Sequence, residues 1–336
     1  MSTRSHEITI LGATGWTATI CAEHIAKTFP TNTRWCIAGR SAAKLEALRQ
    51  DLQAINPDRL EPAIYIIPQL NAEGLEPIVR KTKVLINGIG PYHHYGTPVV
   101  DACARNGTHY VDFSTETAWI AQMIRNFHEP AKGSGAIIIP AISGSSAPSY
   151  LVAWLIARHL QEQGLPAASE IVWSGKLRML GTAALNPNIY GQDLVYKEYS
   201  PATCLISALL MHMVTKLGIS LLAVPWFRSF IRGKSFDRGS GPDRDESRKM
   251  ESAERKAVGY VTGKKEQVAL AEFSYKGALV DMAAILAVEA AATINQMNKS
   301  EATGAGLLTP STLGLTFVDR LRAAGFDLMV EGPESH

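Results

Sequence analysis

The sequence predicts an α/β fold, in which an N-terminal parallel sheet is followed by a second domain of α+β type. Over roughly the first 145 residues, short apolar runs alternate with helical runs. Strands that are apolar throughout are typical of a parallel sheet covered by helices on both faces. After that point the rhythm changes to long helices and a strand pair. The length of 336 residues agrees with about two domains.

The first domain is expected over residues 1–145, with strands and helices in regular order. The expected strands are Ile8–Leu11, Trp35–Ala38, Ala63–Ile67, Val84–Asn87, Tyr110–Phe113 and Ala136–Pro140. The expected helices are Ala18–Phe29, Ala42–Ile55, Ala72–Lys81, Thr97–Asn106 and Ala118–Lys132. In the second of these helices, Leu45, Leu48 and Leu52 recur at helical spacing.

The second domain is expected over residues 146–310, followed by a C-terminal segment, 311–336. Its expected helices are Leu151–Gln163, Thr203–Val224 and Ala278–Met297. Its expected strands are Glu170–Arg178, Lys256–Thr262 and Gln267–Tyr275. We interpret Arg232–Lys249 as an exposed loop, because it is rich in Gly, Arg, Asp and Ser.

Composition excludes several classes of protein. A formal charge of +2 gives no reason to expect a nucleic-acid partner. The four cysteines form no C-x-x-C pair and no His cluster has zinc spacing, so we expect reduced thiols and no metal. The polar residues Met1–Glu7 run straight into a strand and leave no room for a signal peptide, so we expect a cytoplasmic protein.

The most specific pattern is a glycine-rich turn after the first expected strand. Residues 12–18, Gly-Ala-Thr-Gly-Trp-Thr-Ala, read G-x-x-G-x-x-A between a strand and a helix. Gly12 permits the tight turn, Gly15 lets the backbone approach a pyrophosphate, and Ala18 lets the helix pack closely. The start of the helix offers N–H groups and partial positive charge to the phosphates. The pattern predicts a Rossmann-type dinucleotide site formed by Gly12, Ala13, Thr14, Gly15, Trp16 and Thr17.

The end of the second strand indicates which dinucleotide is bound. It reads Ala38-Gly39-Arg40-Ser41, with Lys44 one turn later and no carboxylate. An NAD site usually has Asp or Glu here to accept from the ribose hydroxyls. A guanidinium, a hydroxyl and an ammonium suit a 2′-phosphate instead. Arg40, Ser41 and Lys44 therefore favour NADP(H), unless Arg40 and Lys44 are ordinary solvated charges.

With these motifs, the chain resembles the saccharopine dehydrogenase-like oxidoreductases, a group that includes the trans-acting enoyl reductases. The similarity begins with residues 12–18 and Ala38–Leu45. It continues through Val84–Tyr92, Tyr95–Cys103, Gly107–Glu116, Gly306–Pro310 and Arg320–Gly325. It covers nearly the whole chain and is thin between about 155 and 240.

The resemblance implies a Rossmann domain, a substrate domain, and a return of the C-terminal segment 311–336 to the first domain. It also implies that the loop Asn87–Tyr92 lies along the cofactor near the nicotinamide. Its two glycines suit that role because backbone there approaches a ligand closely. The implied cofactor contacts are Asn87, Gly88, Gly90 and Pro91.

One departure from the family pattern bears on the substrate. Where relatives carry Gly-Phe-Asp-Ser-x-Pro-x-Asp, residues 143–150 here read Ser-Gly-Ser-Ser-Ala-Pro-Ser-Tyr. Both acidic positions are lost, and Ser145 and Tyr150 stand in their place. This favours a less polar substrate, a Tyr or His acid, or chemistry that is no longer redox.

Four polar or aromatic residues follow the implied nicotinamide loop. A Tyr or His there can donate a proton during reduction. We take Tyr92, His93 and Tyr95 as candidate catalytic residues, with His94 beside them. The alternative for each is packing at the domain junction or exposure to solvent.

A second polar group follows the fifth strand, at the same edge of the sheet. Asp112, Ser114 and Glu116 are candidates for substrate binding, together with Ser145 and Tyr150. The alternative is that Ser114 or Thr115 caps the next helix.

The run from Cys204 to Phe230 is unusually apolar, but Lys216 interrupts it. A spanning helix needs roughly 20 apolar residues with few charges, so we do not expect it to cross a membrane. The interpretations left open are a core helix, a homodimer interface, an apolar wall for the substrate, and a helix lying on a membrane surface.

The leading hypothesis is an NADP(H)-dependent reductase of a C=C or related double bond in a hydrophobic small molecule, in specialised metabolite biosynthesis. The second is a non-redox isomerase or cyclase on the same fold, motivated by Ser145 and Tyr150. The third is a nucleotide-sensing or membrane-associated protein without catalysis. The intact glycine turn and Arg40 favour the first.

Overall fold

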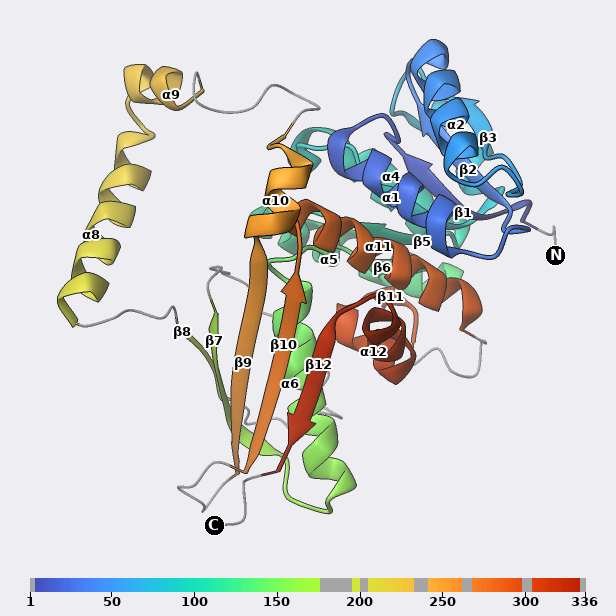
Figure 1. Ribbon diagram of the computed structural model, residues 1–336. Coiled ribbons are helices and arrows are strands. Elements are labelled where there is room, and N and C mark those ends of the chain that lie inside the picture. The colour runs from blue at the N-terminus through green and yellow to red at the C-terminus, as the bar shows by residue number, and fades with distance from the viewer. Residues whose placement is uncertain are drawn as a thin grey trace.

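The computed structural model describes residues 4–175, 195–199, 205–232, 241–261, 268–297 and 304–332, arranged around two sheets (Figure 1). Parts of the expected segments lie outside these ranges, namely 1–3, 176–178, 203–204, 233–240, 262, 267 and 333–336. The predicted α/β class and the Rossmann-type sheet are confirmed.

The first sheet has seven strands, and all its pairs are parallel. The strand order is β11-β6-β5-β4-β1-β2-β3. The strands are β1 (His6–Leu11), β2 (Trp35–Gly39), β3 (Ala63–Ile66), β4 (Thr82–Asn87), β5 (His109–Asp112), β6 (Ile137–Ile139) and β11 (Gly306–Leu307). The helices between them are α1 (Trp16–Thr28), α2 (Ala42–Ile55), α3 (Ala72–Val79), α4 (Tyr92–Asn106) and α5 (Thr117–Ser134).

Two separate apolar clusters lie on the two faces of this sheet. On one face, α3, α4 and α5 cover the strands. On the other face, α1 and α11 (Leu279–Gln296) lie against the strands, and the cluster continues into the second half of the molecule. Burial on both faces explains why the strands read as apolar throughout.

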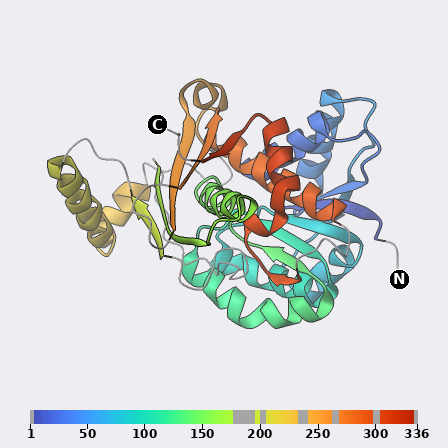
Figure 2. The ribbon, with the colours of Figure 1, turned by 90° about the horizontal axis from the view of Figure 1, so that it is seen from below.

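The second sheet has five strands in the order β12-β10-β9-β7-β8. These are β7 (Ala168–Gly175), β8 (Val195–Tyr199), β9 (Ser252–Val261), β10 (Ala269–Lys276) and β12 (Asp327–Glu331). All neighbouring pairs are antiparallel except β7 with β8. The helix α6 (Ala147–Glu162) packs against β9 and β10, and the view down its axis in Figure 2 shows it between the two sheets.

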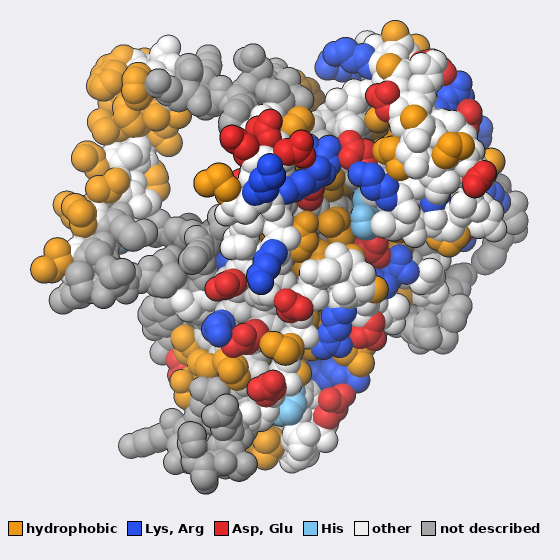
Figure 3. Space-filling model, in the orientation of Figure 1, with side chains coloured by type: hydrophobic (Ala, Val, Ile, Leu, Met, Phe, Trp, Pro, Cys, Tyr) orange, Lys and Arg blue, Asp and Glu red, His pale blue; other side chains and the backbone are white. Residues whose placement is uncertain are grey.

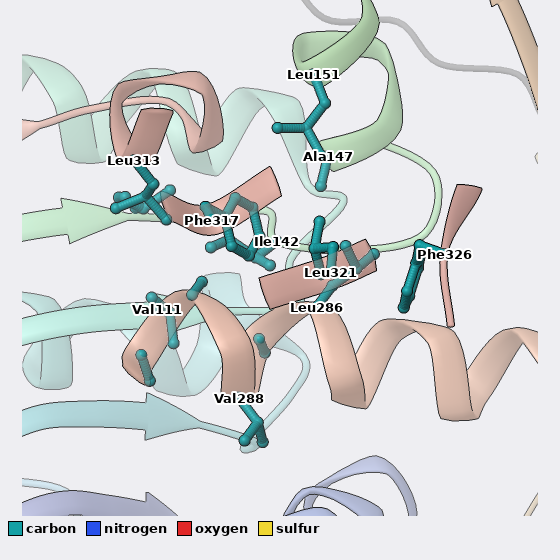
Figure 4. Close-up of a cluster of buried hydrophobic side chains, with 14 of the residues drawn as sticks. Val111, Ile142, Ala147, Leu151, Leu286, Val288, Leu313, Phe317, Leu321 and Phe326 are labelled. Atoms are coloured by element: carbon teal, nitrogen blue, oxygen red, sulfur yellow. The ribbon is translucent and has the colours of Figure 1, made fainter. Parts of the chain in front are cut away.

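The C-terminal part of the chain crosses between the sheets. The strand β11 pairs with β6 of the first sheet, and β12 pairs with β10 of the second. Between them lie the short helix Pro310–Leu313 and α12 (Gly314–Ala323). Figure 4 shows how Phe317 and Leu321 of α12 meet Leu286 of α11 and the start of α6. The chain thus returns to the first sheet at residue 306 and ends its described part in the second.

The expected loop at Arg232–Lys249 is wrong in its second half. A helix, α10, spans Arg244–Met250, and the Asp243 side chain caps it by accepting from the N–H groups of Asp245 and Glu246 at 2.9 Å each. Asp243 and Glu246 have the spacing of a capping signal, which outweighs the polar composition.

Two further helices, α8 (Leu205–Leu221) and α9 (Pro225–Arg232), project away from both sheets (Figure 1). Among the described residues, one helix is long and apolar enough to cross a membrane, namely α11, and two thirds of it is buried in the core. His212–Leu221 and Pro225–Ile231 pass the same test only as a pair, bent by 109°.

Candidate active site

The candidate site lies at the carboxyl edge of the first sheet, where the strand order changes direction. From β1 the sheet continues through β2 and β3 on one side, and through β4, β5 and β6 on the other. The glycine turn follows β1, and the loop Asn87–Pro91 follows β4. In open α/β sheets, ligands bind in the crevice at such a switch point.

The turn and the loop pack with no space for a side chain. Gly12 has a φ of +75°, and its N–H donates to the Ala38 carbonyl at 2.8 Å. The N–H of Gly88 donates to the Leu11 carbonyl at 2.9 Å, and a Cβ on Gly88 would lie 2.6 Å from the Ala18 Cβ. Each of Gly12, Ala18 and Gly88 must therefore be small, since a larger residue at any of them would push the turn and the loop apart.

The residues present fit a dinucleotide pyrophosphate. Gly15 is the N-cap of α1, and no side chain caps this end of the helix. Ala13 is buried, Thr14 is exposed, and Gly15, Trp16 and Thr17 are half-buried. The N–H groups of the first helical turn are therefore open to a phosphate, and the helix dipole favours negative charge there.

The predicted 2′-phosphate ligands stand at the neighbouring strand end. Arg40, Ser41 and Lys44 are all exposed just after β2. The Ser41 side chain caps α2 by accepting from the Lys44 N–H at 3.4 Å. The Arg40 guanidinium is thus exposed at the edge where the turn meets β2, as a 2′-phosphate ligand requires.

A segment from the second half of the chain packs against the side chains of Trp16 and Glu23 of α1, a contact that the sequence did not predict. The Cα of Gly241 sits so close to the indole of Trp16 that a Cβ there would lie 2.4 Å from Nε1. Arg244 of α10 forms a bidentate ion pair with Glu23 of α1, at 3.0 Å to each oxygen. The capping signal at Asp243 reveals the helix, but its place over α1 depends on tertiary contacts.

A buried polar network holds the Asn87 loop in place. The Asn87 amide donates to the Tyr110 hydroxyl at 3.1 Å and accepts from the Ile89 N–H at 3.1 Å. The Tyr110 hydroxyl donates in turn to Asp112 at 2.7 Å. Asn87 is fully buried, so it positions the loop through its neighbours.

Tyr92, a candidate proton donor, belongs to the same buried network. Its hydroxyl donates to the Asn87 carbonyl at 3.0 Å and accepts from the Phe113 N–H at 3.2 Å. Burial raises the pKa of Tyr92 well above its ordinary value, and the nearby Asp112 raises it further. This geometry directs its proton to the loop backbone and makes Tyr92 a positioning residue.

Asp112 and Ser114, two candidates for substrate binding, lie inside the fold. Both side chains are fully buried. Asp112 accepts from the Ser114 hydroxyl at 2.7 Å and from the Ala141 N–H at 2.7 Å. Burial raises the pKa of Asp112, and these hydrogen bonds act in the opposite direction. The carboxylate thus ties the ends of β5 and β6 together. Neither Ser114 nor Thr115 caps α5, whose N-cap is Glu116.

His93 and Glu116 form the exposed polar pair of the site. The Glu116 carboxylate accepts from the N–H groups of Tyr92 and His93 at 2.7 and 2.9 Å, so it caps α4. The same carboxylate lies 2.5 Å from His93 Nδ1. Partial burial acts to raise the pKa of Glu116, but the bonds from His93 and Tyr92 outweigh it and lower the pKa.

This cap explains why α4 begins at Tyr92, five residues before the expected start. The carboxylate orients the imidazole, since it fixes Nδ1 and leaves Nε2 for a ligand. Tyr95 is also exposed, on the same first turn.

Ser145 and Tyr150 lie where the family pattern has carboxylates. The Ser143 hydroxyl is 3.0 Å from those of both Ser145 and Ser146, at the start of α6. Burial raises the pKa of Tyr150. Ser145 and Tyr150 therefore carry no charge at neutral pH.

A hollow of about 570 Å³ lies at the opposite, amino edge of the first sheet. His24 of α1 and Arg320 of α12 both contact Glu289 of α11 within it, at 2.8 Å each. It is remote from the glycine turn, so we assign the candidate site from the turn and not from this cavity. Among the described residues, no cluster of His, Cys, Asp and Glu could hold a metal ion.

Comparisons with known proteins show similarity in the first sheet and in the fold as a whole. Residues 8–139 match the model of the saccharopine dehydrogenase NADP-binding domain. A trans-acting enoyl reductase of Mycobacterium ulcerans is 32% identical over 167 residues, which is 50% of this chain and 39% of that protein. A lipid droplet localized protein of Caenorhabditis elegans is 32% identical over 148 residues, 44% of this chain and 35% of that protein. These matches span less than two fifths of the relatives' length.

The fold as a whole is similar to that of a solved saccharopine dehydrogenase (L-Glu forming) from Saccharomyces cerevisiae. The TM-score is 0.58 with 12% sequence identity, over 97% of this chain and 99% of that one. At this identity the likeness shows the fold alone. The match to the saccharopine dehydrogenase NADP-binding domain covers residues 8–139, which is less than half of this chain.

Proposed function

We propose that this chain is an NADP(H)-dependent reductase that acts on a C=C or related double bond in a hydrophobic small molecule. The observation that carries the proposal is the close packing of the glycine turn against the Asn87 loop at the switch point, beside an exposed Arg40. Relatives named as trans-acting enoyl reductases support the reaction class.

The residues divide the work between holding the cofactor and supplying a proton. Residues Gly12–Thr17 hold the pyrophosphate, and Arg40 and Lys44 pair with the 2′-phosphate. When bound, the reduced cofactor supplies a hydride to one carbon of the double bond. As the imidazolium, His93 would donate the Nε2 proton to the neighbouring carbon and become a neutral ring whose Nδ1–H stays bonded to Glu116, which orients it.

The uncharged Ser145 and Tyr150, which stand where the family pattern has carboxylates, support a substrate without a cationic group, because a charged amine beside them would be left without a partner. The relative named for its lipid-droplet location supports an apolar setting.

The cofactor is tested by titrating the protein with NADPH and NADH. Wild type is expected to prefer NADPH, and Arg40→Ala to lose the preference by about tenfold or more, since a charged hydrogen bond is worth roughly 1.5–3 kcal/mol. Arg80→Ala is the matched control, because that arginine is exposed at the end of α3. Equal binding of both cofactors by wild type would contradict the NADP(H) assignment.

The proton donor is tested with a panel of enoyl thioesters, following NADPH absorbance. His93→Gln is expected to lower kcat by about 10²-fold or more, the usual size of a general acid's contribution. The adjacent His94→Gln serves as control. Glu116→Gln is expected to show a smaller loss together with a shifted pH profile. Unchanged turnover in His93→Gln would remove His93 from the mechanism.

The second candidate function is a non-redox isomerase or cyclase, favoured by the loss of both acidic positions at Ser145 and Tyr150. The same panel separates the two functions. Product formed without net NADPH oxidation would support the isomerase and contradict the reductase.

A further inference from the structure

The helix pair α8–α9 presents the largest run of exposed apolar side chains in the described part of the chain. None of its described side chains is buried. Ile206, Leu209, Leu210, Met213, Val214 and Leu217 are between 57% and 77% exposed. Figure 3 shows these side chains along α8, and over α9 above it. Contiguous apolar surface of this kind marks an interaction site or a membrane contact.

The distribution of apolar residues around α8 points to a lipid phase. Ile206, Leu210 and Leu217 follow one stripe of the helix, which a second protein chain could cover. Ile219 lies on the opposite side of α8 and is 63% exposed, and Leu222, just past the end of the helix, is 44% exposed. A helix that is apolar on opposite sides needs an apolar environment around it, and a single docked helix does not provide one.

The second helix has the pattern of an interfacial helix. Trp226, Phe227 and Phe230 share one face of α9 with Ile231, and Arg228 lies on the other face. Trp226 and Phe230 are 66% and 56% exposed. Helices of this type lie at the boundary between headgroups and acyl chains, with Trp at that level and Arg toward the headgroups.

The shape and the charges limit how the pair can insert. The helices meet at 109°, so they do not form one straight span. At 17 residues, α8 is about 25 Å long, shorter than the hydrocarbon core of roughly 30 Å. Lys216, Arg228 and Arg232 are the charged residues of the segment 205–232, and it contains no Asp or Glu. Long basic side chains reach from shallow depth to the headgroups, where anionic lipids attract them.

We propose that α8 and α9 embed in one leaflet of a phospholipid membrane with anionic headgroups. The acyl chains surround the apolar side chains of α8 and the aromatic face of α9. Lys216 and Arg228 reach the headgroup phosphates. The two sheets and the candidate active site then stay outside the membrane, held at its surface.

The test is flotation of the full chain with vesicles of phosphatidylcholine alone and of phosphatidylcholine with phosphatidylglycerol. The double variant Leu210→Glu/Leu217→Glu is expected to lose vesicle binding by about tenfold or more, because charges replace two exposed leucines that the acyl chains would surround. Leu60→Glu is the matched control, an exposed leucine on the main body. Arg228→Ala is expected to weaken binding about fivefold on the anionic vesicles only.

NADPH binding and light scattering without lipid complete the experiment. Unchanged NADPH binding by the double variant shows that the body is folded. Flotation by wild type and Leu60→Glu, but not by the double variant, supports the proposal. It is overturned if wild type does not float or if the double variant floats equally well. A wild-type dimer that the double variant disrupts, without flotation, overturns it in favour of a second copy of this chain. Equal flotation of wild type with both vesicle types overturns the proposed preference for anionic headgroups.

Discussion

The carboxyl edge of the first sheet and the helix pair α8–α9 are both built from small and apolar residues, but their surroundings are opposite. At the sheet edge, a single added methyl on Gly88 would lie 2.6 Å from Ala18. On α8, the side chains of Leu210 and Leu217 are more than 60% exposed. Substitutions at the edge therefore report on packing as much as on cofactor binding, whereas substitutions on α8 report on its partner with little disturbance of the fold.

The largest expected effect is a loss of folding stability in the first sheet as the pH falls. His109 of β5 accepts from the Ile137 N–H at 3.0 Å, so the fold holds it neutral. Burial lowers its pKa to about 4, with Arg4 and Lys83 contributing. Between about pH 6.5 and 4 the unfolded chain takes up a proton that the folded chain does not, which costs up to about 3 kcal/mol of stability.

That loss is measured by urea unfolding across this pH range. His109→Asn keeps an acceptor near the Nδ1 position and is expected to remove most of the pH dependence. His212→Asn, on exposed α8, is the control and should leave it unchanged. A wild-type stability that is flat from pH 6.5 to 4 would contradict the buried, neutral His109.

The second prediction sets two glycines against each other. Gly88→Ala is expected to lower the free energy of unfolding by about 2 kcal/mol, because the turn and the loop cannot separate freely. Gly133→Ala, in α5 with no atom within 4 Å of the added Cβ, is expected to raise it by roughly 0.5–1 kcal/mol. Chemical denaturation measures both. If both variants changed the free energy of unfolding by the same amount in the same direction, the close packing at Gly88 would be contradicted.

The smallest expected effect lies on α8. Leu210→Ser removes an apolar side chain that contacts little of the folded body, so the free energy of unfolding without lipid should change by less than about 0.5 kcal/mol. Leu286→Ser, in the core helix α11, is the buried counterpart and is expected to cost more than about 2 kcal/mol. A comparable loss in Leu210→Ser would mean that α8 packs against protein in solution.

The sequence was a good guide to the first sheet because its signals are local. Each signal is contained within a few residues. The apolar runs form the predicted strands, and the glycine turn and the Arg40–Lys44 segment follow the strands predicted for them. The position of Asp112 at the sheet edge was also predictable. Its inward direction was not, because the N–H of Ala141 and the hydroxyl of Tyr110 hold it from distant parts of the chain.

Two other features depend on contacts that no local pattern encodes. Glu116 caps α4 across 24 residues and thereby orients His93. The helix α8 was predicted from its apolar run, but an apolar sequence of this kind is the same whether the helix is buried or exposed. Only the structure separates a core helix such as α11 from a helix that stands free.

The first sheet needs β11 at its edge and α11 on one of its faces. Both elements come late in the chain, so the sheet cannot be completed until most of the chain has been synthesised. The dinucleotide-binding half is made first, yet its edge strand at Gly306–Leu307 and the helix Leu279–Gln296 emerge from the ribosome much later. Until then, β1, β4 and β5 expose apolar side chains on the face that α11 will cover. The apolar face of the dinucleotide-binding half is therefore an aggregation hazard until the second half of the chain has been made.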